Sequence, residues 1–75
     1  MKIGDYVKLR GSFDYNGKKG KIIEIDDCLY NGKTIKRLLV QGKGLGGAVK
    51  KNKKGKKEPV TNARYAYDFM VEKVN

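Results

Sequence analysis

Residues 4–25 read GDYVKLRGSFDYNGKKGKIIEI, and this stretch decides the fold. Val7 and Leu9 alternate with basic residues, which is typical of a strand that has one buried face and one wet face. Three glycines and a cluster of lysines follow, and glycines in a loop supply positive φ or close backbone approach. The apolar run after Gly20 indicates a second strand. The stretch therefore predicts two strands joined by a tight, positively charged loop.

The rest of the chain also favours strands. Its 75 residues make one domain, 1–75, in which 39% of residues are hydrophobic and 35% are charged. Residues 33–41 (KTIKRLLVQ) predict a third strand after an Asn-Gly turn, and the aromatic tail predicts more, broken by a helical turn near Asp68. Three consecutive apolar residues at 38–40 indicate a bulge or burial on both faces. The expected core comprises Val7, Leu9, Ile22, Ile23, Ile25, Ile35, Leu39, Phe69 and Val71.

Positive charge is concentrated in one segment. The chain carries a net charge of +10, and residues 43–57 hold seven lysines and no acid. This glycine-rich segment has few apolar side chains, so we predict a mobile basic loop at about 42–58. One interpretation is a solubilising loop. We favour a flexible arm that neutralises phosphates, because a strongly basic small domain attracts polyanions.

The first stretch resembles a known family. Its pattern is Gly4-Asp5-x-Val7-x-Leu9-x-Gly11, then Gly17-x-x-Gly20-x-Ile22-x-x-Ile25. This is similar to the KOW motif of SH3-like barrels, found in ribosomal proteins, transcription-elongation factors and small bacterial or phage proteins. The resemblance implies an all-β fold, a small SH3-like five-stranded barrel whose first loop touches RNA, DNA or a protein partner. A longer first loop, with SFDYN between Gly11 and Gly17, departs from the family pattern.

Lysines next to aromatic residues make the candidate site. Lysine ammonium groups attract phosphates, and exposed tyrosine rings stack on bases. The three arginines are outnumbered by fifteen lysines. Arginine forks read guanine, so lysine-rich binding is mostly backbone-directed and weakly sequence-specific. The predicted nucleic-acid-binding residues are Lys18, Lys19, Lys43, Lys50, Lys51, Lys53, Lys54, Lys56, Lys57, Arg64, Tyr15 and Tyr65, with Phe13 next to Tyr15 in the first loop.

Catalysis has little support in the sequence. There is no histidine, the usual general base and the commonest metal ligand. Cys28 follows two aspartates and has no histidine that could activate it as a nucleophile. The glycines at 42, 44 and 47 match a dinucleotide fingerprint, yet a lysine-rich stretch follows them in place of a helix. We expect no enzyme, no cofactor and no metal.

Two functions remain open. The first is a non-enzymatic nucleic-acid-binding module, with either RNA or DNA as partner. The alternative is a protein-interaction adaptor that docks on a ribosome, a polymerase or another host enzyme in a transcription or translation assembly, through the SFDYN loop or an exposed edge strand. The start of the chain has no apolar run typical of a signal peptide, and Cys28 is a lone cysteine. We therefore expect a cytoplasmic protein with no membrane partner.

Overall fold

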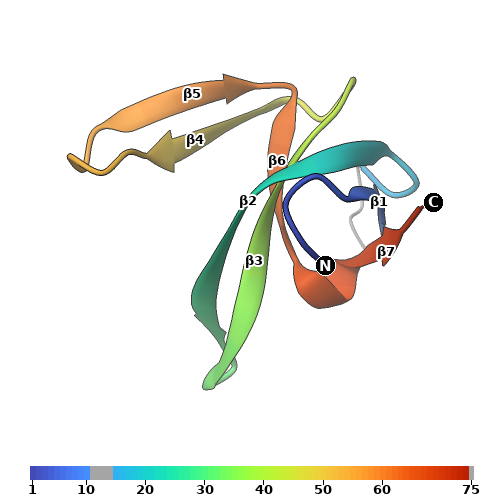
Figure 1. Ribbon diagram of the computed structural model, residues 1–75, viewed down its shortest axis with the longest axis horizontal. Helices are drawn as coiled ribbons and strands as arrows, with labels where there is room; N and C mark the ends of the chain where they lie inside the picture. The colour runs from blue at the N-terminus through green and yellow to red at the C-terminus, as the bar shows by residue number, and fades with distance from the viewer. Residues whose placement is uncertain (11–14, 75) are drawn as a thin grey trace.

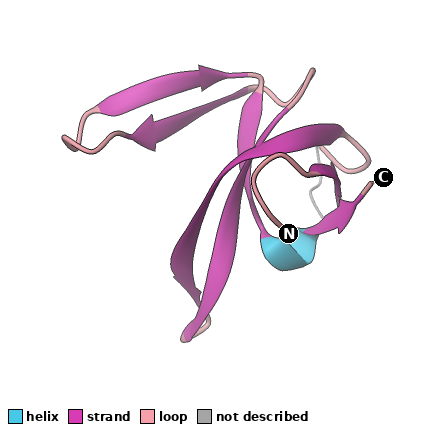
Figure 2. Ribbon diagram, viewed as in Figure 1, coloured by secondary structure: helices cyan, strands magenta, loops and turns pink. Residues whose placement is uncertain are grey.

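The computed structural model describes residues 1–10 and 15–74. In this part of the chain the secondary structure is almost entirely β, as predicted, with one short 3-10 turn (Figure 2). The elements, in chain order, are β1 (Tyr6–Leu9), β2 (Lys19–Tyr30), β3 (Lys33–Gln41), β4 (Gly47–Lys51), β5 (Lys57–Thr61), β6 (Ala63–Tyr67), the 3-10 turn η1 (Asp68–Met70) and β7 (Val71–Lys73).

Five strands form one antiparallel sheet in the order β6-β3-β2-β1-β7, and β4 pairs with β5 in a separate hairpin (Figure 1). The two edge strands, β6 and β7, are consecutive in the chain and are joined by η1. The helical turn expected near Asp68 is therefore confirmed. Within the described residues the sheet is open, because β6 and β7 do not pair. The five-stranded sheet is confirmed, whereas the closed SH3-like barrel stays a prediction.

The run of three apolar residues in β3 is buried on both faces of the sheet. Leu38 and Val40 belong to the main core cluster, and Leu39 is fully buried on the opposite face. Alternate residues of a strand point to opposite faces, so this run needs cover on each side. The register between β2 and β3 also shifts between Ile22 and Glu24. Two-sided burial therefore explains the apolar run, whereas the bulge lies in β2, where Ile23 is the extra residue, and not in β3.

The core differs in part from the predicted set. Val7, Leu9, Ile22, Leu39 and Val71 are buried as expected. Ile23, Ile25 and Ile35 are only half-buried. Phe69 is 57% exposed, because η1 interrupts the alternation on which its assignment depended. The buried residues that the prediction missed are Leu38, Val40, Leu45, Ala63 and Ala66.

The prediction of a loop at about 42–58 is wrong for residues 47–51 and 57–58, which belong to the strands of the β4–β5 hairpin. Its five-residue turn is closed by a backbone hydrogen bond from Asn52 to Lys56 (2.9 Å). The Asn52 side-chain oxygen accepts from the amides of Lys54 (2.9 Å) and Lys56 (3.0 Å), and Gly55 adopts φ +79°. Asn52 and Gly55 thus stabilise a defined turn, which the lysine-rich composition of this segment did not indicate. Pro59 lies in a strand with one neighbour, where its missing N–H costs no ladder bond.

The hairpin is attached to the sheet where backbones approach closely. A Cβ on Gly20 would lie 2.7 Å from the Gln41 carbonyl oxygen, and one on Gly42 would meet the Lys19 carbonyl. Only glycine fits at these two positions. Beyond Gly42, Leu45 is fully buried in the core and anchors the start of the hairpin. In the described part of the chain, no helix has the length and apolar character needed to cross a bilayer.

Candidate nucleic-acid interface

The β4–β5 hairpin extends from the sheet and has two different faces (Figure 1). Residues opposite each other in an antiparallel pair share a face. Ala48 pairs with Val60 and Lys50 pairs with Glu58, and three of these four residues are half-buried. This is the inner face, which turns toward the sheet. The outer face consists of exposed pairs, namely Gly47 with Thr61, Val49 with Pro59, and Lys51 with Lys57.

Lys50 belongs to the inner face and does not point to solvent with the other lysines. Its ammonium group donates to a Glu24 carboxylate oxygen at 3.0 Å, and its side chain is only 29% exposed. This hydrogen bond, with the charge of Glu24, raises the pKa of Lys50 above its ordinary value. The predicted phosphate contact at Lys50 is therefore not supported, because the chain's own carboxylate already occupies that ammonium group.

Five lysines of the hairpin are exposed on its outer face and turn: Lys51, Lys53, Lys54, Lys56 and Lys57. In the described residues, none of them has a carboxylate within 4 Å. Lys51 and Lys57 lie directly opposite each other, and like charges in this arrangement destabilise a strand pair. Glu58, the nearest acid in sequence, accepts a hydrogen bond from the Asn52 side chain (2.9 Å). The hairpin therefore displays a cluster of ammonium groups that the fold leaves without counter-charge.

The remaining predicted lysines lie nearer to the base of the hairpin. Lys43 is exposed in the turn between β3 and β4. The Lys18 side chain lies beside Gly44 of the same turn, where a Cβ would come within 2.9 Å of its Nζ. Lys19, at the start of β2, is exposed and pairs in register with Lys8 of β1. The structure brings Lys18 and Lys43 to one region, adjacent to but separate from the hairpin turn.

The predicted stacking rings are covered by arginines. Tyr15 is half-buried against the core, and the guanidinium of Arg64 lies 4.2 Å from its ring centroid. Tyr65 is also half-buried, and the guanidinium of Arg37 lies 4.3 Å from its centroid. Each ring thus has one face occupied by a cation within the same chain. Phe13 lies outside the described residues.

Arg37 is a residue that sequence reasoning missed. It forms a two-point ion pair with Asp26, at 3.1 Å through Nε and 2.6 Å through Nη2, while it covers Tyr65. The hydrogen bonds to Asp26 raise the pKa of Arg37. The sequence signal for this pair was the Asp26–Asp27 dipeptide and the Lys36–Arg37 dipeptide, placed symmetrically about the Asn-Gly turn. Directly opposed strand positions follow from that symmetry.

A cleft of about 360 Å³ separates the hairpin from the polar face of the sheet. Glu24, Asp26, Arg37 and Tyr65 line it from the sheet, and Lys50 lines it from the hairpin together with its chain neighbours Val49 and Lys51. These two neighbours thus border the cleft as well as the outer face. Acidic and basic groups are mixed in this cleft, and the Lys50–Glu24 pair crosses it. Because its charges are compensated internally, the cleft presents a weaker attraction for a polyanion than the outer face does.

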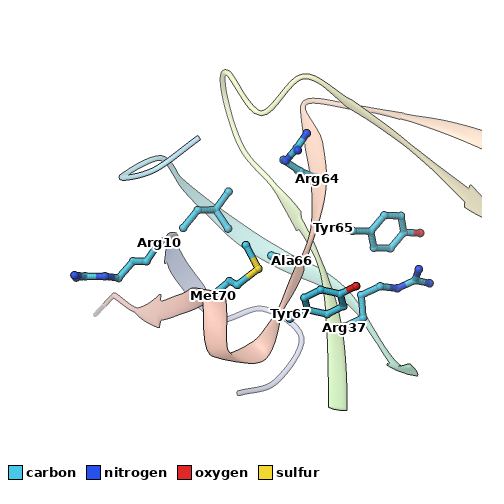
Figure 3. A pocket seen from close by; sticks show the side chains of 8 residues that line it. Arg10, Arg37, Arg64, Tyr65, Ala66, Tyr67 and Met70 are labelled. Atoms are coloured by element: carbon cyan, nitrogen blue, oxygen red, sulfur yellow. The ribbon is translucent and has the colours of Figure 1, made fainter. Parts of the chain in front are cut away.

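A second pocket, of about 270 Å³, lies along the edge strand β6 (Figure 3). Its walls include all three arginines of the chain, Arg10, Arg37 and Arg64. Figure 3 shows their guanidinium groups pointing in different directions, away from a common centre. Leu9, Ala66 and Met70 supply an apolar lining between them. The pocket therefore combines an apolar interior with a basic rim, and its arginines do not converge on one anion.

The described residues contain no group of three His, Cys, Asp or Glu side chains arranged to hold a metal ion. Cys28 is a half-buried free thiol. The glycine pattern at 42–47 leads into strand β4, so the helix that a dinucleotide site requires does not follow it. The arrangement with the clearest physical consequence is the lysine cluster of the hairpin.

Comparison with known proteins gives no relative. No family model, curated protein or solved structure matches this chain.

Proposed function

We propose that this chain is a non-enzymatic nucleic-acid-binding module that contacts the phosphate backbone through the β4–β5 hairpin. One observation carries the proposal: the fold pairs Lys50 with Glu24 but leaves the five outer lysines without carboxylates in the described residues. Polyphosphates supply the missing counter-charge, and releasing their condensed counterions drives association. Binding of this kind is weakly sequence-specific.

The ordered turn strengthens the proposal. Asn52 and Gly55 fix the backbone that carries the lysines at 53, 54 and 56, so these side chains start from a defined surface. A preformed hairpin loses less conformational entropy on binding than a flexible arm. The acid-free turn therefore serves as a rigid platform for phosphate contacts. Lys18, Lys43 and Arg64 extend the positive surface at the base of the hairpin.

The test is a salt titration of binding to generic DNA and RNA, measured by fluorescence anisotropy. If five phosphates are neutralised, log K falls against log salt with a slope of about −4.5 on duplex and about −3.5 on single strands. Replacing Lys51, Lys53, Lys54, Lys56 and Lys57 by glutamine should remove most of this slope and leave a smaller one from the residues at the base of the hairpin. Absence of binding at 50 mM salt would remove the proposal.

A matched control separates local contacts from overall charge. Five lysines outside the hairpin, Lys2, Lys21, Lys33, Lys36 and Lys73, are exposed and can also be changed to glutamine. This control has the same net charge as the hairpin variant. We expect it to keep most of the salt slope, since its phosphate contacts remain. Equal losses in the two variants would mean that general charge, and not the hairpin, governs binding.

The strand order supports the finer assignment to an SH3-like barrel. The last strand pairs with the first, and the two edge strands are joined by a single 3-10 turn. Because this turn is short, it keeps the two edge strands close together, as closure of a barrel requires. In this interpretation the β4–β5 hairpin is an insertion between the third and fourth barrel strands. The KOW-like assignment rests on the resemblance of residues 4–25.

The second candidate function is a protein-interaction adaptor, and the pocket along β6 favours it. An edge strand beside an apolar slot suits an extended peptide that adds to the sheet. In this role the lysines would increase the association rate. Pull-down from nuclease-treated extract discriminates between the two. Partners that survive digestion support the adaptor, and partners lost with the nucleic acid support the leading proposal.

A further inference from the structure

We propose that the β4–β5 hairpin enters the major groove of B-form DNA with its outer face toward the base edges. This inference rests on the proposed function and specifies its ligand. Three properties of the hairpin carry it: its neighbouring rings are covered, its form is a two-stranded ribbon, and its outer face contains an exposed apolar pair.

The first property disfavours single strands. Proteins that hold single strands combine a basic track with aromatic faces on which bases stack. Residues 47–61 contain no aromatic residue. The tyrosines near the hairpin, Tyr15 and Tyr65, each have an arginine guanidinium over one ring face, 4.2 and 4.3 Å from the ring centroid. The β2–β3 turn and η1, which carry exposed aromatic rings, lie at the other end of the sheet from the hairpin (Figure 1). Among the described residues, the lysine cluster therefore has no adjacent stacking platform.

The second property separates B-form DNA from duplex RNA. Two paired strands lie about 4.8 Å apart, and a ribbon of this width fits a major groove about 12 Å wide. The major groove of A-form RNA is deep and narrow and does not admit such an element. Five residues per strand give the ribbon a length of about 17 Å, about half a turn of B-DNA. The hairpin has the dimensions of a groove-binding ribbon.

The third property orients the ribbon in the groove. Val49 is 56% exposed, and it pairs with exposed Pro59 on the outer face. Phosphate groups are charged and offer no apolar surface on which this pair could pack. The floor of the major groove presents the C5-methyl groups of thymine, which are apolar. With Val49 and Pro59 on these methyls, Lys51 and Lys57 form the next outward-facing pair toward the turn. These two lysines and the turn lysines then lie near the phosphates that border the groove.

The experiment compares four probes of one sequence by anisotropy at 50 mM salt: the DNA duplex, the same duplex with deoxyuridine for thymidine, the RNA duplex and the single DNA strand. Deoxyuridine removes only the major-groove methyl. We expect the DNA duplex to bind at least tenfold more tightly than the RNA duplex or the single strand. Loss of methyl groups should weaken binding about fourfold for each methyl contacted.

A double comparison ties the methyl effect to the hairpin. Val49→Ala should reduce the difference in affinity between the two DNA duplexes, and the part that remains comes from Pro59. Ile3→Ala, a control at another exposed apolar residue (62%), should keep the full difference. Equal affinity of the unaltered protein for the thymidine and deoxyuridine duplexes would overturn the groove placement. So would tighter binding to RNA or to single strands, and in either case a retained lysine-dependent salt slope leaves the proposed function standing. Failure to bind any of the four probes removes both proposals.

Discussion

The molecule contains two antiparallel ribbons of similar construction and opposite electrostatics. In the outer half of the β2–β3 ribbon, Asp26 faces Arg37 and Asp27 faces Lys36, and both pairs form ion pairs at 2.6 Å. In the β4–β5 hairpin, Lys50 faces Glu58 on the inner face, but Lys51 faces Lys57 on the outer face. The β2–β3 ribbon neutralises these charges across its strands, whereas in the described residues the outer lysines of the hairpin have no carboxylate within 4 Å. The proposed function therefore depends on how the charges pair across the strands, and not only on the number of lysines.

Removing the hairpin is the most severe way to test this contrast. Gly47 and Thr61 are opposed in the β4–β5 register, so residues 48–60 can be replaced by Asn-Gly, a sequence suited to a two-residue turn. Every fully buried hydrophobic residue lies outside the deleted segment. We therefore expect a folded sheet by circular dichroism and an affinity for DNA reduced at least about 100-fold. DNA binding that persists in this variant would move the interface elsewhere.

Reversing one charge in each ribbon should shift stability in opposite directions. Lys57→Glu gives Lys51 an opposite charge, so the hairpin should gain about 0.2–1 kcal/mol in free energy of unfolding. The same change should weaken DNA binding about tenfold at 50 mM salt, because one phosphate contact is lost. Urea denaturation and anisotropy on the same sample measure both quantities.

Lys36→Glu is the matched control in the β2–β3 ribbon. It makes the same change in net charge, but it places a carboxylate opposite Asp27 and removes an ion pair. We expect this variant to be less stable than the unaltered protein and to lose less affinity than Lys57→Glu. If the two variants change stability in the same direction, the contrast between the ribbons does not hold.

The smallest expected effect is on the pKa of Lys36. The hydrogen bond from Lys36 to Asp27 raises the pKa of Lys36 above its ordinary value of 10.5. A raised pKa in the folded state means that the ion pair stabilises the protein at pH values below the unfolded pKa, and this contribution is lost as the pH rises through the folded pKa. Side-chain NMR should show Lys36 titrating late, and Asp27→Asn should lower its midpoint. An unchanged midpoint would mean that the ion pair does not form in solution.

Much of the sheet could be predicted from sequence. The alternation of residues 5–10 predicted the first strand to within one residue at each end, and the third strand ends where expected, at Gln41. The second strand is longer than expected, because it continues past Asp26 to Tyr30, directly before the Asn-Gly turn. These elements are specified by local patterns. The exposed position of Phe69 could not be predicted in the same way, because η1 changes the direction of the chain within a sequence whose alternation appears continuous.

The candidate site was predictable in charge but not in geometry. Composition identified the lysine cluster, yet it also implied a loop, because lysine and glycine are common in disordered segments. The hydrogen bonds of Asn52 that order the turn join residues two and four positions apart and leave no trace in hydrophobic periodicity. Whether a given lysine is paired depends on how the strands are arranged, and the pairing of Lys50 with Glu24, 26 residues away, could not be predicted from the sequence.

The pairing of β1 with β7 has a consequence for synthesis. Val7 lies opposite Lys73, so β1 lacks one of its two neighbouring strands, β7, until residues 71–73 have left the ribosome. Long-range contacts of this kind form slowly, because loop closure precedes them. The β2–β3 ribbon, whose strands are joined by a two-residue turn, can form much earlier during translation. Nascent chains therefore pass through an interval in which the ribbon is formed and the edge of β1 is unpaired, and in that interval an incomplete sheet is open to association with a neighbouring nascent chain.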